Sequence, residues 1–516
     1  MFWMKAAGYL SLRTPRYAKG RAQAALASIL FVGLVMGFLS HHPSAVVAQS
    51  GIVWEGPTRI SRETDYNPAS PRLTVDTYGV LHVFYSDWMG EPDEYRRIAG
   101  QSRFVQNVIL YTYLQDGQWS TPVDVLATQD TTAVVRGVVF NPATLRLHIV
   151  WRDETRLYVS SAPAAAAVNP RVWRTDVVSI ERPNDANIAI DQNGTLHLVY
   201  SVNIRDLYYT NSTDDGATWS TPTLLASAPT LAQAYDTIRL VVDPENNLHL
   251  LWQETNEDNA WNPTAVWYSR AEALGQEYTW YDPIEFVRVS AGQFSLGQAN
   301  IGFGSTGQAV MIWNRGAGSK DGRYYRWSDD NGRTWTASTL VSQVEGYSGL
   351  AGWSYPVWDS AGNLHLIMPA GEAFETPGSV GGIYHSLWKG TSWSRPEWLS
   401  PGEFPDVALS NGNWIHIICN TFGNDPWLAY IRVETNAPHI PSPEVPSTPT
   451  LTKPISGTMV PELLVETPEV ANPLSIDTAA SIKPQLQAYQ PILISLMLSG
   501  LVMCIVFFLH HRRNRR

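Results

Sequence analysis

The chain repeats one pattern of apolar and polar positions. An apolar residue and an Asp precede a short turn, and the turn leads into Leu-His and then into apolar and aromatic residues. Turn formers between residues that favour strands predict two strands joined by a turn. The seven stretches that follow the pattern, some of them loosely, are “VDTYGVLHVFYS”, “FNPATLRLHIVWR”, “IDQNGTLHLVYS”, “VDPENNLHLLWQ”, “FGSTGQAVMIWN”, “WDSAGNLHLIMP” and “LSNGNWIHIICN”. Six of them carry a histidine at the matched place, namely His82, His148, His197, His249, His365 and His416.

Two more predicted strands follow the copies. The third is an aromatic stretch such as “DLYYTNS” or “AVWYSRA”, and the fourth begins with Trp. These tryptophans are Trp119, Trp173, Trp219, Trp280, Trp335 and Trp393, and with Trp54 they have a mean spacing of about 56 residues. Four antiparallel strands repeated at such a spacing are typical of propeller blades. The sequence therefore predicts an all-β fold, a seven-bladed β-propeller of four-stranded blades over residues 49–436.

The last copy of the repeat lacks a fourth strand of its own. The chain continues from “PWLAYIRVE” into a Pro-rich segment. The stretch “VWEGPTRIS”, residues 53–61, has the missing features, with Trp54 followed by Pro57 and Ile60. We expect it to complete the last blade and so to close the ring, which leaves no open sheet edge. Arg59 is then a strand residue, and a catalytic role for it is the less favoured reading.

Both ends of the chain have the composition of membrane-directed segments. Basic residues and the run “AALASILFVGLVMGFLS” predict a signal peptide over residues 1–48, with an uncleaved anchor as the alternative. Residues 437–487 are rich in Pro, Ser and Thr, which predicts a semi-rigid stalk. Residues 488–511 are long and apolar enough for a transmembrane helix, with a buried core helix as the alternative, and residues 512–516 form a basic tail. We expect a single-pass membrane protein with the propeller outside the cell and the tail in the cytoplasm.

Charge limits the kinds of partner that the protein binds, and cysteine content indicates the kind of organism that it comes from. Between the predicted signal peptide and stalk the chain has 25 basic and 42 acidic residues, a net charge of −17. Such a body repels nucleic acid and favours a neutral or cationic partner. Its only cysteine is Cys419, so no disulfide forms within the outer domain. An exported domain without disulfides favours a prokaryotic surface protein.

Two connections between third and fourth strands share the motif Ser-x-Asp-x-Gly-x-Thr-Trp. They are “STDDGATW” and “SDDNGRTW”, and they resemble the Asp box of sialidases and related propellers. We expect the Asp to accept hydrogen bonds from turn amides, the Gly to permit the backbone reversal and the Trp to pack between blades. The residues expected in these structural roles are Ser212, Asp214, Gly216, Trp219, Ser328, Asp330, Gly332 and Trp335.

The resemblance covers about residues 52–434 and implies a catalytic set of three arginines that grip a carboxylate, a Tyr–Glu nucleophile pair and an Asp acid. The Arg-Ile-Pro signature that it implies before the first strand pair reads “ASPRL” here, with Arg72 two or three places late. We therefore favour a non-catalytic surface propeller that binds carbohydrate or protein. A glycoside hydrolase of sialidase-like fold is the alternative, and whether the protein is an enzyme stays open.

The candidate site lies on the face where the long loops follow the second strands, because extra loop length on one face of a scaffold usually carries function. Asp87 and Glu254 are weak candidates for an acid and base pair. The candidate binding residues are Trp88, Arg152, Asp153, Trp261 and Arg315. We expect no metal, because six histidines on six blades do not converge on one ion, and we expect no cofactor.

Overall fold

The computed structural model describes residues 46–47, 52–89, 106–128, 132–179, 182–259, 262–275, 277–289, 296–315, 322–343, 352–370, 381–421 and 426–443. These residues form strands and three short 3-10 helices, Ala164–Ala166, Pro170–Val172 and Glu257–Asn259. Among them no helix is long and apolar enough to cross a membrane. Nearly all of the predicted signal peptide, the stalk beyond residue 443, the predicted span and the tail lie outside the described residues, so they stay predictions.

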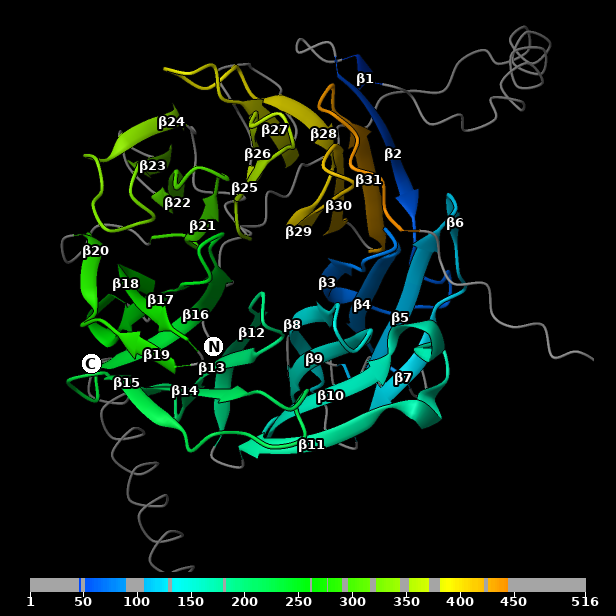
Figure 1. Ribbon diagram of the computed structural model, residues 1–516, viewed down its shortest axis with the longest axis horizontal. Helices are drawn as coiled ribbons and strands as arrows, with labels where there is room; N and C mark the ends of the chain where they lie inside the picture. The colour runs from blue at the N-terminus through cyan, green and yellow to red at the C-terminus, as the bar shows by residue number, and fades with distance from the viewer. Residues whose placement is uncertain are drawn as a thin grey trace, which may run out of the picture. The chain divides into compact units, whose positions relative to one another are not determined.

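Seven antiparallel sheets of four or five strands stand around a common axis (Figure 1). The first strand of each sheet lies nearest the axis, and the inner strands of consecutive blades contact one another all the way round, from β29 back to β3. This arrangement confirms the predicted seven-bladed propeller.

The blades are numbered here in the chain order of their inner strands. Blades 1 to 3 consist of β3 (Ala69–Val75), β4 (Leu81–Asp87), β5 (Val108–Gln115), β6 (Gln118–Trp119) and β7 (Val123–Ala127); β8 (Val134–Asn141), β9 (Arg146–Arg152), β10 (Leu157–Pro163) and β11 (Arg174–Ser179); and β12 (Pro183–Ile190), β13 (Leu196–Val202), β14 (Asp206–Ser212) and β15 (Thr223–Ser227). Blades 4 and 5 consist of β16 (Gln233–Val242), β17 (Leu248–Asn256), β18 (Asn262–Leu274), β19 (Glu277–Trp280) and β20 (Ile284–Arg288); and β21 (Asn300–Phe303), β22 (Ala309–Arg315), β23 (Gly322–Ser328) and β24 (Thr339–Gln343). Blades 6 and 7 consist of β25 (Tyr355–Trp358), β26 (Leu364–Ala370), β27 (Gly382–Leu387) and β28 (Glu397–Ser400); and β29 (Glu403–Ser410), β30 (Trp414–Asn420), β31 (Leu428–Glu434), β2 (Val53–Arg59) and β1 (Val46–Val47).

The ring is closed by β2, which completes blade 7 from the other end of the chain (Figure 1). It pairs antiparallel with β31, with Trp54 opposite Val433 and Arg59 opposite Ala429. The side chain of Arg59 donates to the carbonyl oxygen of Arg62 at 2.9 Å. The prediction that “VWEGPTRIS” is the closing strand is confirmed, and Arg59 is a strand residue.

The repeated tryptophans join each blade to the one before it. Trp119 of blade 1 meets Tyr430 of blade 7 edge to face at 4.9 Å between ring centroids, and Trp54 meets His385 of blade 6 at 5.1 Å. The same contact recurs as Trp173–Phe84, Trp280–Tyr209, Trp335–Tyr268 and Trp393–Tyr325, while Trp219 packs on the apolar cluster that contains Val150. Edge-to-face aromatic pairs stabilise a fold by more than their buried area alone contributes. These contacts therefore stabilise the junctions between neighbouring blades.

The repeated histidines are buried and form hydrogen bonds within the propeller. His249 of β17 shares a hydrogen bond with the hydroxyl of Tyr268 at 2.8 Å and faces the carboxylate of Asp243 at 3.1 Å. His82, His197 and His416 meet Tyr111, Tyr209 and Tyr430 in the same way. In blade 4 the network continues into blade 5, because Tyr268 donates to the carbonyl oxygen of Gly332 at 3.1 Å. A buried polar network of this kind fixes the register of the strands that it joins.

The two Ser-x-Asp-x-Gly-x-Thr-Trp stretches form the same turn. Asp330 accepts hydrogen bonds from Ser328, from the amide of Thr334 at 2.8 Å and from its hydroxyl at 2.6 Å. Asp214 makes the matching set with Ser212 and Thr218. The hydroxyl of each Ser accepts the amide of the Gly, and both glycines have a positive φ, 81° and 75°. In both turns the Asp side chain therefore holds the backbone of the turn, and the Gly takes the conformation that the reversal needs.

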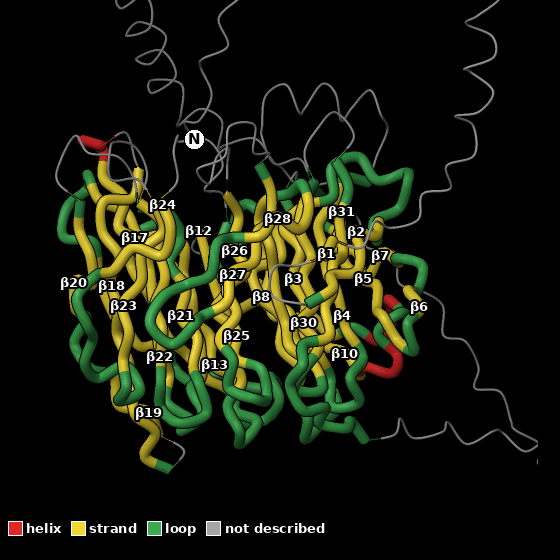
Figure 2. The backbone as a smooth tube through the Cα atoms, turned by 90° about the horizontal axis from the view of Figure 1, so that it is seen from above, coloured by secondary structure: helices red, strands yellow, loops and turns green. Residues whose placement is uncertain are grey.

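The turns define the two faces of the ring. Asp215, which follows Asp214, accepts a hydrogen bond from Asn141 at 2.8 Å, and Asn141 ends the first strand of blade 2. Connections between first and second strands and connections between third and fourth strands therefore share one face, at the lower edge of Figure 2, which we call the turn face. Second strands end on the opposite face, which we call the loop face.

Candidate functional site

The two carboxylates predicted as an acid and base pair lie on different blades and are held by different partners. Asp87 ends β4 in blade 1, is fully buried, and accepts the amides of Tyr66 at 3.1 Å and Asn67 at 2.8 Å. Burial raises the pKa of Asp87 to about 7, and the nearby Asp65 adds to the shift. The carboxylate thereby anchors the segment that joins the closing strand β2 to β3.

Glu254 in blade 4 is 1% exposed and is enclosed by donors. Arg288 donates to both of its oxygens at 3.0 and 3.1 Å, and Trp267 and Gln233 donate at 2.9 and 3.0 Å. Burial opposes ionisation, but these hydrogen bonds outweigh it and lower the pKa of Glu254. A carboxylate held by four donors is stabilised as an anion, which suits a fixed structural charge better than an acid or a base.

The predicted binding residues are largely buried. Trp88 is 6% exposed and Asp153 is 3% exposed. Asp153 accepts the amide of Arg156 at 2.7 Å and the hydroxyl of Tyr158 at 2.6 Å, so it holds the turn between β9 and β10. Arg315 is half-buried at the end of β22, and Trp261 lies outside the described residues.

A set of polar side chains that the sequence analysis missed lines the central channel. Each belongs to the inner strand of a blade. We call this set the channel belt; it consists of Arg72, Arg136, Asn187, Arg239, Asn300, Tyr355 and Asp406. In six blades the belt residue stands ten residues before the repeated histidine or, in blade 5, before Val310 at the matched place. The sequence signal for these residues was therefore a polar residue at a fixed distance before the repeated histidine, within a buried strand.

Hydrogen bonds from the belt join the inner strands of neighbouring blades. Asp406 accepts the amide of Leu73 at 2.9 Å, and Arg72 donates to the carbonyl oxygen of Arg136 at 3.1 Å. Asn187 accepts the amide of Leu240 at 3.1 Å. Arg239 donates to Asn300 at 3.0 Å, and Asn300 donates to the carbonyl oxygen of Ser354 at 3.0 Å. The belt therefore positions its own guanidinium groups.

Four arginines lie in or beside this channel, together with the carboxylates of Asp185, Asp236 and Asp406 on the inner strands. Arg72, Arg136 and Arg239 are joined by Arg152, whose pKa is lowered to about 10 by burial and by the nearby Arg136. Among the described residues, one ion pair within 4.0 Å involves these four arginines, between Arg136 and Asp185 at 3.4 Å. Buried guanidinium groups without carboxylate partners favour an anionic or strongly accepting ligand.

Aromatic rings accompany the arginines. The guanidinium of Arg72 lies 5.0 Å from the ring centroid of Trp353, and that of Arg239 lies 5.3 Å from the ring centroid of Tyr355. Both aromatic residues come from the start of blade 6. A cavity of about 290 Å³ adjoins the belt, and a wider one of about 590 Å³ opens on the turn face between apolar residues such as Val75, Phe140 and Phe303.

The described residues hold no cluster of three His, Cys, Asp or Glu side chains that fits a metal ion. The belt instead offers N–H donors beside aromatic faces.

No family model matches the sequence, and no curated protein matches it. Several solved structures resemble its fold. The polysaccharide lyase Uly1 is 10% identical with a TM-score of 0.49, over 70% of this chain and 89% of that one. An α-L-arabinanase of Penicillium chrysogenum is 14% identical with a TM-score of 0.42, over 73% and 97%. The intramolecular trans-sialidase of Ruminococcus gnavus is 12% identical with a TM-score of 0.42, over 73% and 97%. Such distant likeness carries no conclusion about activity, and the assignment of the two turns as Asp boxes stays a prediction.

Proposed function

We propose that the protein is a cell-surface propeller that binds carbohydrate in its central channel without cleaving it. The observation that carries the proposal is the channel belt with the adjoining Arg152. Among the described residues these four arginines form one ion pair within 4.0 Å, and Arg72 and Arg239 lie over aromatic rings. Arginine N–H groups bind hydroxyl and carboxylate oxygens, and aromatic faces stack on sugar rings. The belt therefore favours a glycan with an acidic group, despite the net charge of −17 over residues 49–436.

The absence of cleavage is proposed from the state of the predicted carboxylates. Asp87 caps two backbone amides, and Glu254 is enclosed by Arg288, Trp267 and Gln233. The pKa of Asp87, about 7, suits proton transfer, but both carboxylates are buried, at 0% and 1% exposed, and turned to these protein donors rather than to a substrate.

The way the chain leaves blade 7 supports display at a surface. Ile440 donates its amide to Asn411 at 2.8 Å, and Ser442 donates to the side chain of Asn411 at 2.5 Å. Asn411 lies in the turn between β29 and β30, so the segment towards the predicted stalk starts on the turn face.

A glycoside hydrolase is the second candidate function, and one observation favours it. Tyr355 is buried beside Asp406 in the belt, among the arginines, and burial together with that carboxylate raises the pKa of the tyrosine. A tyrosine beside a carboxylate is the arrangement expected of the sialidase-like alternative. Tyr355 is held protonated, which weakens it as a nucleophile.

Glycan binding and hydrolysis are separated by two assays on the full-length chain. A glycan array is expected to show binding to acidic oligosaccharides, and chromogenic glycosides, including sialosides and arabinosides, are expected to stay intact. Release of chromogen that is lost in a Tyr355→Phe variant would establish the hydrolase instead. If the chain neither binds any glycan on the array nor releases chromogen, both proposed functions are refuted.

A further inference from the structure

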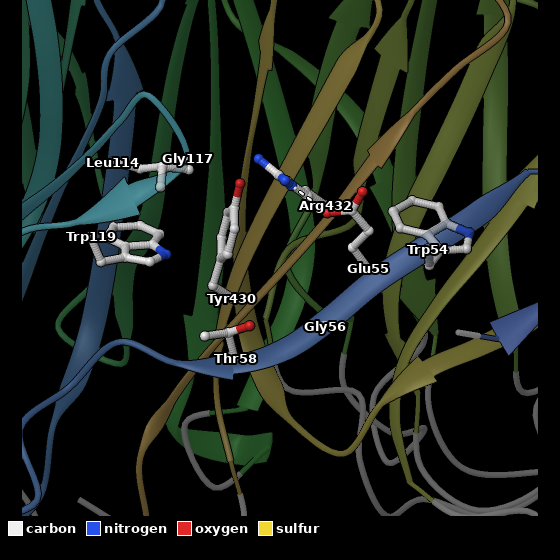
Figure 3. A pocket seen from close by; sticks show the side chains of 9 residues that line it. All are labelled: Trp54, Glu55, Gly56, Thr58, Leu114, Gly117, Trp119, Tyr430 and Arg432. Atoms are coloured by element: carbon white, nitrogen blue, oxygen red, sulfur yellow. Dashed lines mark hydrogen bonds and ion pairs between the residues drawn. The ribbon is translucent and has the colours of Figure 1, made fainter. Parts of the chain in front are cut away.

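A third cavity lies on the outer wall of the ring, at the seam where blade 7 meets blade 1 (Figure 3). We call it the seam groove. It has a volume of about 310 Å³, within the range of small-ligand sites. Its lining residues are Trp54, Glu55, Gly56, Thr58, Leu114, Gly117, Trp119, Tyr430 and Arg432. It is distinct from the central channel, which the inner strands line.

The groove lies beside the short turn between the third and fourth strands of blade 1, whereas side chains bridge two other seams. At the seam of blades 2 and 3, Asp215 contacts Asn141 and His148 at 2.8 Å each. At the seam of blades 3 and 4, Tyr278 reaches Asp191 at 2.7 Å. Blade 1 has a two-residue turn there, and a Cβ on Gly117 would meet nothing within 4 Å.

The groove presents an aromatic wall opposite a charged pair. Trp119 is half-buried and stands edge to face with Tyr430 at 4.9 Å. Arg432 and Glu55 form an ion pair at 2.7 Å across from them, with side chains 30% and 55% exposed. Figure 3 shows Thr58 below Tyr430, with the ion pair on the other side of the tyrosine from Trp119.

These features select a neutral sugar ring. An aromatic face stacks on the apolar face of a pyranose, while a carboxylate and a guanidinium accept from and donate to neighbouring hydroxyls. The guanidinium already has its counter-charge in Glu55, so an anionic group gains little here. This differs from the channel belt with Arg152, where four arginines form one ion pair within 4.0 Å among the described residues.

We propose that the seam groove binds a neutral pyranose unit of a glycan, with the ring on Trp119 and its hydroxyls on Glu55, Arg432 and Thr58. The site provides the propeller with a contact on its side wall, independent of the channel. Its ligand class differs from that of the channel, so the two sites are separable by charge.

The test is saturation-transfer NMR and titration of the full-length chain with methyl glucoside, methyl galactoside and methyl mannoside. We expect saturable binding of at least one of them. Glu55→Gln weakens the ion pair, and Thr58→Trp fills the groove from an exposed position, so each is expected to weaken binding at least tenfold. Asp176→Asn is the matched control, because Arg174 and Asp176 form an exposed pair at 3.0 Å on the outer strand of blade 2.

Two variants are used because Thr58→Trp could fail to fold. Glu55→Gln is nearly isosteric with the parent, so it folds and still tests the site in that case. No saturable binding of any of the three glycosides overturns the proposal. Equal affinity in Glu55→Gln, Asp176→Asn and the parent also overturns it. The channel variant Arg239→Gln is expected to leave this binding unchanged, so failure of the channel proposal does not imitate failure of this one.

Discussion

Replacing Trp54 with Ala tests whether the closing strand holds the ring. Trp54 is 2% exposed, belongs to the core between blades 6 and 7, and contacts the tilted ring of His385 at 5.1 Å between centroids. Truncating a buried Trp removes its transfer free energy and leaves a cavity, which together destabilise a protein by about 3–5 kcal/mol. Against a typical total stability of about 5–15 kcal/mol, this loss is large.

The matched control is the neighbouring residue, Val53, which is 49% exposed on the same strand. Val53→Ala is expected to change the free energy of unfolding by less than about 0.5 kcal/mol. Equilibrium urea denaturation of the full-length chain, followed by tryptophan fluorescence and by circular dichroism, measures both variants. Equal midpoints for Trp54→Ala and the parent would show that the ring does not depend on its closing strand. Deletion of residues 49–61 is expected to abolish cooperative unfolding for the same reason.

Three further predictions concern the buried histidines, the Ser-x-Asp turns and the orientation of the chain in the membrane. Burial lowers the pKa of His416 from 6.5 to about 3. The unfolded chain therefore takes up the proton before the folded protein does, and the free energy of unfolding falls as the pH drops from about 6.5 towards 3. In melting curves measured across this pH range, His416→Gln is expected to reduce the dependence by about one proton. Asp330→Ala is expected to lower the melting temperature and leave glycan affinity unchanged, because its turn lies on the turn face; lost affinity with normal melting would contradict that placement. Protease added to intact cells is expected to release the propeller and spare residues 512–516, and digestion of that tail from outside would reverse the predicted orientation.

The fold was predictable because each blade repeats the same local rules. The Leu-His copies and the spaced tryptophans mark strands whose partners are near in the sequence, and the missing fourth strand of blade 7 pointed to “VWEGPTRIS”. The hydrogen bonds of the Ser-x-Asp turns join residues of one turn, so a short sequence motif is enough to indicate them.

The site was less predictable, because it depends on side chains from several blades. Asp87 and Glu254 looked like a pair in the sequence, yet each is held by partners from other segments, Tyr66 and Asn67 for the first and Arg288 for the second. The belt residues were overlooked because a lone polar residue in a strand signals little until seven of them line one channel. Arg72 appeared misplaced against the sialidase signature, but it lies in the channel beside Trp353.

The most direct test of the account is the affinity of the channel for an acidic oligosaccharide in the parent and in Arg239→Gln. Arg239 holds Tyr355 and Asn300 in the belt, and a hydrogen bond to a charged group contributes about 1.5–3 kcal/mol. The control is Arg270→Gln in the same blade, since Arg270 pairs with Glu272 at 2.8 Å, away from the belt. By isothermal titration calorimetry of the full-length chain, Arg239→Gln is expected to weaken binding about tenfold to a hundredfold, with Arg270→Gln matching the parent. Equal affinities in all three proteins would contradict the channel as the binding site.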